Sequence, residues 1–271
     1  MPVSASSCLG IVDWGIGGVG LVRALDQLAP GLPLLYWSDT GAIPYGRMGV
    51  DELTARLTTV VAALAELGAT EVVLACNAAS TVVGRLGAAQ VPVEGIIGHG
   101  VAAVPEQIAG PIGVVGGRRT IAGGQYRRAL ARPGRAVLSR VAQPLSAHIE
   151  AGRAGSPQFL ADLARIVAPL QRVDILVLAC THYPAASRWF AAALPHATLI
   201  DPAQRLAEAV AERYPHFRRT PHLATRTFFT TGDPDAMRRA AASAWGRALR
   251  ATAIRCGARG DSYSVSIVIT S

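Results

Sequence analysis

The sequence predicts an α/β fold: two similar three-layer domains with mainly parallel sheets, related by pseudo-symmetry, and an active site in the cleft between them. Apolar segments typical of buried strands alternate with helix-like segments, the pattern of parallel sheets covered by helices. Two similar apolar segments occur at 72–77 and 176–181, and in both a cysteine precedes small polar residues. Because functional groups of open α/β sheets lie at the carboxyl ends of strands, each half is expected to present one thiol to a shared cleft.

The individual elements follow from the same alternation. The composition is 51% hydrophobic but only 6% aromatic, so the core is expected to be aliphatic. Strands are expected at 9–13, 34–37, 72–76, 93–97, 112–115, 136–141, 175–180 and 197–200. Helix-like stretches lie between them, for example at 50–66, 125–131, 157–169 and 202–213.

The two cysteine-ended strands divide the chain into comparable halves, with residues 92–100 as the expected crossing between domains. A further strand at 226–231 and a helix at 234–249 are expected to return to the first domain. The first domain is therefore predicted to comprise 1–97 and 208–255, and the second 98–207. The tail, 256–271, is rich in Ser and Gly before a short alternating run, and it is left unassigned.

Composition narrows the class of protein. No apolar run approaches the roughly 18–20 residues that span a bilayer, and no basic segment precedes an apolar core at the start. The four cysteines lack the spacing of zinc sites or of a disulfide framework. These features predict a cytoplasmic protein with no membrane partner and no bound metal.

The formal net charge of +8 comes entirely from arginine, because the chain contains no lysine. Seven arginines and no acidic residue lie between Pro111 and Ile149, which makes a nucleic-acid surface one alternative. These arginines lack the interleaved aromatic residues of a base-stacking surface, and a GC-rich coding bias also favours arginine over lysine. Nucleic-acid binding is therefore not expected to be the main function.

A glycine-rich turn follows the first predicted strand. Gly15, Gly17 and Gly20 have the dinucleotide-binding spacing, and Asp39 ends the next strand near the expected acidic position. Asp13 and Trp14, however, stand between the strand and the glycines, where a pyrophosphate would approach. Backbone N–H groups at a helix start also bind other anions, including carboxylates.

Cys76 and Cys180 each have two interpretations. A free cysteine is often an inert buried residue. Here both cysteines end equivalent predicted strands and are followed by polar residues. His182 lies two residues after Cys180, and a reactive thiol requires such a neighbour to become a thiolate. Cys8 and Cys256 lack such a setting and are interpreted as structural.

Together these segments resemble the glutamate racemase family, and the resemblance runs in order from about residue 9 to about residue 249. The segments that carry it are Asp13-x-Gly15-x-Gly17-Gly18, Pro44-Tyr45-Gly46, Cys76-Asn77-x-Ala79-Ser80-Thr81, Ile112-Gly113-Val114, Thr120-Ile121, Cys180-Thr181-His182-Tyr183-Pro184 and Thr230-Thr231-Gly232-Asp233. The resemblance implies a racemase that needs no metal or cofactor and supplies D-glutamate for peptidoglycan. It also leaves a homodimer as one alternative.

The resemblance further implies individual roles. Cys76 would act on the D-enantiomer with help from Asp13, and Cys180 on the L-enantiomer with help from His182 and Glu150. Substrate contacts are expected from eight positions: Trp14, Pro44, Tyr45, Gly46, Asn77, Ala78, Thr120 and Thr181.

The chain departs from the family pattern where hydroxyl side chains are expected, with Trp14, Ala78 and Gly117 in their place. Arg118 or Arg119 could supply a carboxylate clamp instead, or both could face solvent. Two alternatives to a glutamate racemase follow: a racemase or epimerase of the same superfamily with a changed substrate, such as aspartate or a secondary-metabolite precursor, and a non-catalytic binding or regulatory relative.

Overall fold

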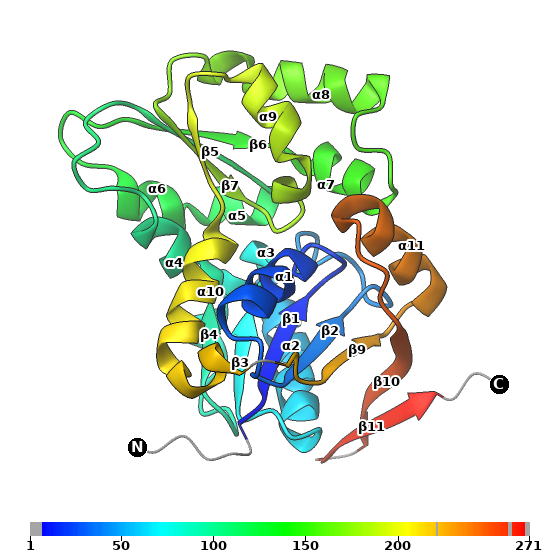
Figure 1. Ribbon diagram of the computed structural model, residues 1–271. Helices are drawn as coiled ribbons and strands as arrows, with labels where there is room; N and C mark the ends of the chain where they lie inside the picture. Colours follow the sequence, from blue (N-terminus) through cyan, green and yellow to red (C-terminus); the bar gives the residue numbers. More distant parts are fainter. Residues whose placement is uncertain (1–6, 221, 260–261, 269–271) are drawn as a thin grey trace.

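The computed structural model describes residues 7–220, 222–259 and 262–268, and their backbone forms two sheets flanked by helices (Figure 1). The first sheet has seven strands in the order β11-β10-β9-β2-β1-β3-β4, and the second has four in the order β6-β5-β7-β8. The strands are β1 (Leu9–Asp13), β2 (Leu34–Ser38), β3 (Glu71–Leu74), β4 (Val93–Gly95), β5 (Ile112–Gly116), β6 (Val137–Val141), β7 (Ile175–Ala179), β8 (Thr198–Ile200), β9 (Arg226–Thr230), β10 (Ala251–Arg259) and β11 (Ser262–Val268).

Helices fill the connections and cover the sheets. The α-helices are α1 (Val19–Leu28), α2 (Val50–Glu66), α3 (Asn77–Ser80), α4 (Ile96–Ala102), α5 (Arg118–Gly123), α6 (Gln125–Leu130), α7 (Gln143–Glu150), α8 (Pro157–Val167), α9 (Ser187–Ala193), α10 (Pro202–Arg213) and α11 (Pro234–Trp245). The 3₁₀ turns are η1 (Val83–Arg85), η2 (Ala168–Leu170), η3 (Tyr183–Ala186) and η4 (Pro215–Arg219). Within the part of the chain that the structure describes, no helix is both long and apolar enough to cross a membrane.

The two sheets repeat one strand order. In the first sheet β2-β1-β3-β4 are all parallel, and in the second β6-β5-β7-β8 are parallel in the same relative order. Strand β3, which leads to Cys76, thus corresponds to β7, which leads to Cys180. The predicted α/β fold with mainly parallel sheets is confirmed, and the repeated segment of the sequence occupies equivalent strands.

The central strands read as nearly continuous apolar runs because helices bury both of their faces. All residues of β1, β5 and β7 are buried, including the carboxyl group of Asp13 at the end of β1. A buried charged residue at a strand end needs partners, so its position already indicates a site.

Several element ends differ from the prediction for local reasons. Strand β3 stops at Leu74 because the main chain turns at Cys76, whose carbonyl accepts the first hydrogen bond of α3 from Ser80 N. Helix α11 stops at Trp245 rather than at 249, because Gly246 adopts φ +61° and caps it with a hydrogen bond to Ala242 O. The unassigned tail contributes β11 and the end of β10, which extend the first sheet beyond β9.

The join between the two sheets is helical. Helix α10 packs against α1, α4 and β7, and in Figure 1 α4 and α10 lie side by side where the two sheets meet. The predicted domain boundaries at 97/98 and 207/208 fall inside these two helices. Both chain crossings are therefore stiffened by helix packing.

Candidate active site

The two repeated cysteines face a common region between the sheets. Cys76 precedes α3 and Cys180 follows β7, and both thiol-bearing residues are partly exposed. The charge of Cys180 is one of the influences that raise the pKa of Cys76, so the two thiols are close enough to interact electrostatically. The structure therefore brings the two thiols near each other, one from each half of the chain.

His182 and Glu150 form a chain of hydrogen bonds that begins at Cys180. His182 Nδ1 lies 3.8 Å from Cys180 Sγ, and His182 Nε2 lies 2.5 Å from Glu150 Oε2. Burial lowers the pKa of His182, but hydrogen bonds to Cys180 and Glu150 outweigh it and hold that pKa well above the ordinary value. The imidazole is therefore held as a cation beside this thiol.

Glu150 also connects the two sheets. It ends α7, which belongs to the layer around the second sheet, and its Oε2 accepts a hydrogen bond of 3.2 Å from Ile16 N in the glycine-rich turn. A Cβ atom at Gly15 would collide with the Glu150 carboxylate, and one at Gly17 would collide with Thr181. The glycines thus allow Glu150 and Thr181 to lie directly against this turn, where a bound pyrophosphate would otherwise lie if the turn held a dinucleotide.

Asp13 lies close enough to Cys76 for its charge to affect the pKa of that thiol. Its Oδ1 accepts a hydrogen bond of 2.6 Å from Trp14 N, while Oδ2 has no partner of standard geometry among the residues described. Burial raises the pKa of Asp13, and the nearby His182 and Thr181 oppose that rise. Burial and the Asp13 charge raise the pKa of Cys76 well above its ordinary value, so this thiol retains its proton. The groups near the two thiols are therefore chemically different: a carboxyl group near Cys76, and an imidazole with a carboxylate near Cys180.

Three of the predicted substrate residues have buried polar side chains. Asn77 Oδ1 accepts a hydrogen bond of 2.8 Å from Tyr126 OH, whereas Asn77 Nδ2 is buried with no acceptor within the described chain. Thr181 and Thr120 are also buried, the latter on α5, and Ala78 is partly exposed on α3. The Asn77 amide therefore has one donor, Nδ2, without a partner among the described residues.

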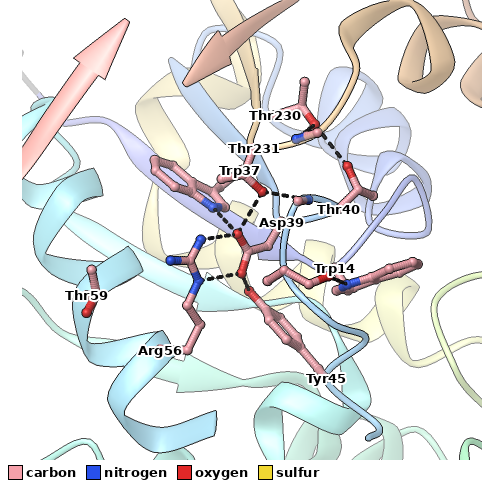
Figure 2. Close-up of polar contacts among 12 residues, drawn as sticks. Trp14, Trp37, Asp39, Thr40, Tyr45, Arg56, Thr59, Thr230 and Thr231 are labelled. Carbon is pink, nitrogen blue, oxygen red and sulfur yellow. Dashed lines mark hydrogen bonds and ion pairs between the residues drawn. The ribbon is translucent and has the colours of Figure 1, made fainter. Parts of the chain in front are cut away.

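The turn at Pro44, Tyr45 and Gly46 is held from within the first sheet. The Tyr45 ring is buried, and its OH donates to Asp39 Oδ2 at 2.9 Å (Figure 2). The carbonyl of Pro44 accepts a hydrogen bond from Arg47 N, which closes the turn. Trp14 Nε1 donates to Ala42 O at 3.0 Å, which ties the indole to the same loop.

Asp39 is the centre of a network that the sequence did not indicate. Its two oxygens accept hydrogen bonds from Arg56 at 2.5 and 2.8 Å, from Trp37 Nε1 at 3.3 Å and from Thr231 Oγ1 at 3.0 Å (Figure 2). A fully buried carboxylate with this many donors fixes the start of the loop that carries the turn.

Arg118 and Arg119, offered either as a carboxylate clamp or as two solvent-facing residues, differ from each other in the structure. Arg118 is exposed, as its solvent-facing alternative predicted. Arg119 Nε donates to Tyr45 O at 3.1 Å, and its Nη2 donates to Met48 O. Two of the five N–H donors of the Arg119 guanidinium are thus used by main-chain carbonyls of the loop between β2 and α2.

Cys8 lies at the opposite, amino end of β1, where its main chain bonds to Thr70, in keeping with a structural interpretation. The side chain of Cys256 lies outside the described residues, so its role stays a prediction. Tyr126 was missed at the sequence level, because its partner Asn77 is 49 residues away and no local pattern joins the two.

Two mainly parallel sheets, each with a cysteine after an equivalent strand and titratable side chains nearby, fit an isomerase of the racemase class, and comparisons with known proteins show that class. The profile of the family described as Asp/Glu/hydantoin racemase matches residues 9–210. Within that group, the chain belongs to the glutamate racemase family.

Relatives of the chain match it over nearly its whole length. The glutamate racemase of Desulforudis audaxviator is 32% identical over 260 residues, covering 90% of this chain and 95% of the relative. That of Mycolicibacterium paratuberculosis is 36% identical over 262 residues, covering 91% and 95%.

Solved structures agree with these relatives. A glutamate racemase isoform of Bacillus anthracis superposes with a TM-score of 0.83 at 26% identity, covering 92% of this chain and 97% of that one. The Thermus thermophilus glutamate racemase, solved in complex with β-chloro-D-alanine, gives a TM-score of 0.80 at 27% identity, covering 91% and 96%. The likeness thus includes both sheets.

Proposed function

We propose that this protein interconverts L- and D-glutamate by moving the α-proton between Cys76 and Cys180. The observation that carries the proposal is that each sheet contributes one thiol with its own proton-handling partner: Asp13 for Cys76, and His182 with Glu150 for Cys180. The names of the relatives support glutamate as the substrate. In this proposal the two domains, 1–97 with 208–255 and 98–207, each bring one thiol to the cleft.

The chemistry requires two groups because the proton leaves one face of the α-carbon and returns to the other. Starting from L-glutamate, the Cys180 thiolate takes the α-proton and becomes a thiol. The electron pair left on carbon takes a proton from the Cys76 thiol on the opposite face, which yields D-glutamate and a Cys76 thiolate. The reverse reaction begins from that thiolate.

The side chains around the thiols fit these steps. The raised pKa of Cys76 keeps it protonated, as a proton donor must be before the reaction. The His182 cation stabilises negative charge on Cys180 and is itself held by Glu150. Fixed donors such as Asn77 Nδ2 and the Thr181 hydroxyl would stabilise the negative charge that develops on the substrate.

The proposal extends to the setting of the enzyme. D-Glutamate made in the cytoplasm would supply peptidoglycan synthesis, and a homodimer is a compatible assembly. The Thermus thermophilus relative was solved with β-chloro-D-alanine, which supports a small amino-acid ligand for this cleft as well.

A second candidate, a racemase of the same superfamily with another amino-acid substrate, rests on one observation. Trp14, Ala78 and Gly117 stand where the family pattern has hydroxyl side chains. A hydrogen bond to a charged group contributes about 1.5–3 kcal/mol, so unreplaced losses of this kind can change substrate preference. Trp14 adds bulk while the other two remove it, which reshapes the pocket.

Proton NMR in D₂O tests the proposal and separates these candidates. The purified protein is incubated with L-glutamate, D-glutamate and a panel of other amino acids. Loss of the glutamate α-proton signal with formation of the opposite enantiomer is the expected result. Exchange with another amino acid but not with glutamate would transfer the assignment to the second candidate, and absence of exchange across the panel would favour a binding role.

The raised pKa of His182 predicts a pH dependence of stability. An imidazolium whose pKa is raised by folding contributes its full stabilisation below the unfolded pKa of about 6.5, and the contribution is lost as the pH rises through the folded value. We expect Glu150→Gln, which removes the negative partner of His182, to lower stability most near pH 6 and progressively less at alkaline pH.

Urea unfolding of both proteins across this pH range measures the difference. Glu212→Gln, which alters a surface pair with Arg205, is the matched control and should change stability little at any pH. A difference between wild type and Glu150→Gln that stays constant with pH would contradict the expectation.

A further inference from the structure

We propose that Arg119 is a positioning residue that holds the turn at 44–46 in place from the opposite sheet, through main-chain carbonyls rather than through the substrate. This proposal rests on the proposed function and on the expectation, implied by the resemblance, that this turn contacts the substrate. Neither the repeated strands nor the two thiols require an arginine at this position.

The loop between β2 and α2 carries the turn and is anchored at its start by the first sheet. Asp39, at the beginning of the loop, is fixed by Arg56 and Thr231 and in turn accepts the Tyr45 hydroxyl (Figure 2). Trp14, directly after β1, adds a hydrogen bond to Ala42 O. All of these anchors belong to elements of the first sheet.

Arg119 reaches the same loop from the other side of the cleft. It lies on α5, which packs against β5 and β6 of the second sheet and also contacts α3. Its Nε donates to Tyr45 O at 3.1 Å and its Nη2 to Met48 O, so one guanidinium spans the second half of the loop. The turn is therefore held between Asp39 of one sheet and Arg119 of the other.

The acceptors of Arg119 are main-chain carbonyls, and this determines what the contact does. Because Arg119 bonds to main-chain oxygens, it constrains the backbone of the turn whatever side chains the turn carries. Separating the sheets must break both hydrogen bonds, whereas the Asp39 network would move intact with the first sheet. Arg119 therefore stabilises the arrangement in which the turn and the second sheet lie together, and substrate binds more tightly when that arrangement is more populated.

The neighbouring residue Arg118 provides a matched control. Its side chain is exposed and has no hydrogen bond or ion pair within the described part of the chain, while its main-chain N–H donates to Gln143 Oε1 at 3.2 Å. Arg118→Ala thus removes the same charge from the same helical turn without touching the loop at 39–49.

The test compares Arg119→Ala, Arg119→Lys and Arg118→Ala with wild type in glutamate racemisation and in amide hydrogen–deuterium exchange. For Arg119→Ala we expect KM to rise about tenfold, equivalent to about 1.4 kcal/mol, with kcat within about threefold, and faster exchange of amides 40–48. Lysine retains a cationic donor but cannot bond both carbonyls with a planar fork, so it should restore KM only in part. Arg118→Ala should match wild type in both measurements.

An unchanged KM, unchanged exchange at 40–48, or equal effects of Arg118→Ala would each overturn the proposal. The exchange measurement needs no substrate and therefore separates this inference from the proposed function. If wild type does not turn over glutamate, the proposed function fails, while faster exchange confined to 40–48 in Arg119→Ala would still support the contact across the cleft.

Discussion

Alanine at either Cys76 or Cys180 is expected to abolish racemisation, with a loss of at least about 10³-fold in kcat/KM. Each thiol serves one face of the α-carbon, so removing one leaves a proton without a donor or an acceptor on that face, and acid–base groups of this kind contribute about 10²–10⁴-fold each. The measurement is the appearance of D-glutamate from L-glutamate, and of L-glutamate from D-glutamate, for both variants.

Cys8→Ala is the control for this experiment, because Cys8 lies at the amino end of β1, away from the strand ends that present the two thiols. It should retain the activity of wild type. Circular dichroism of all three variants would establish that the fold is kept. Substantial racemisation by Cys180→Ala would refute the assignment of opposite faces to the two cysteines.

Asp39→Asn is expected to cause the largest loss of stability among the substitutions considered. The Asp39 carboxylate is fully buried and is the ionic partner of Arg56, at 2.5 Å. Removing one partner of a buried pair costs about 3–5 kcal/mol, and the partial exposure of Arg56 favours the lower end of this range. For a chain of this size the melting temperature should fall by roughly 6–12 °C.

The chain offers a surface pair of the same chemistry as a control. Asp51 pairs with Arg85 at 2.8 Å, but both side chains are well exposed, so Asp51→Asn should leave the melting temperature nearly unchanged. Thermal melts of the three proteins give the comparison. Similar melting temperatures for Asp39→Asn and Asp51→Asn would show that the Asp39 network is not required for stability.

The parts of the fold that the sequence predicts are those encoded by short-range patterns. Strands β1 and β7 are continuous apolar runs, so their positions are readable without tertiary information, and α2 and α10 begin and end as expected. The tail, 256–271, is left unassigned because its Ser- and Gly-rich start gives no clear element and its short alternating run does not show what it pairs with. It forms β11 and the end of β10 by pairing at the edge of the first sheet, which is a tertiary effect.

The contacts of the candidate site also fall into those that a short-range pattern predicts and those that only the fold creates. Cys180 and His182 are two residues apart, so their contact was visible in the sequence. Glu150 lies 32 residues from His182 and was named only through the resemblance, since packing of α7 brings the two together. The contact of Arg119 with Tyr45 joins residues 74 apart, and no local pattern distinguishes Arg119 from Arg118 before the fold is known.

The different side chains near Cys76 and Cys180 have a consequence for the direction of the reaction. Enantiomers have the same free energy in water, so a racemase works at an equilibrium constant of one, and kcat/KM must be identical for the forward and reverse reactions. The asymmetry between Asp13 beside Cys76 and the His182–Glu150 pair beside Cys180 therefore cannot favour either enantiomer at equilibrium. It can only give the two enantiomers different values of kcat and of KM whose ratio is the same. Every variant with a substitution at Asp13, His182 or Glu150 must also have equal kcat/KM in both directions.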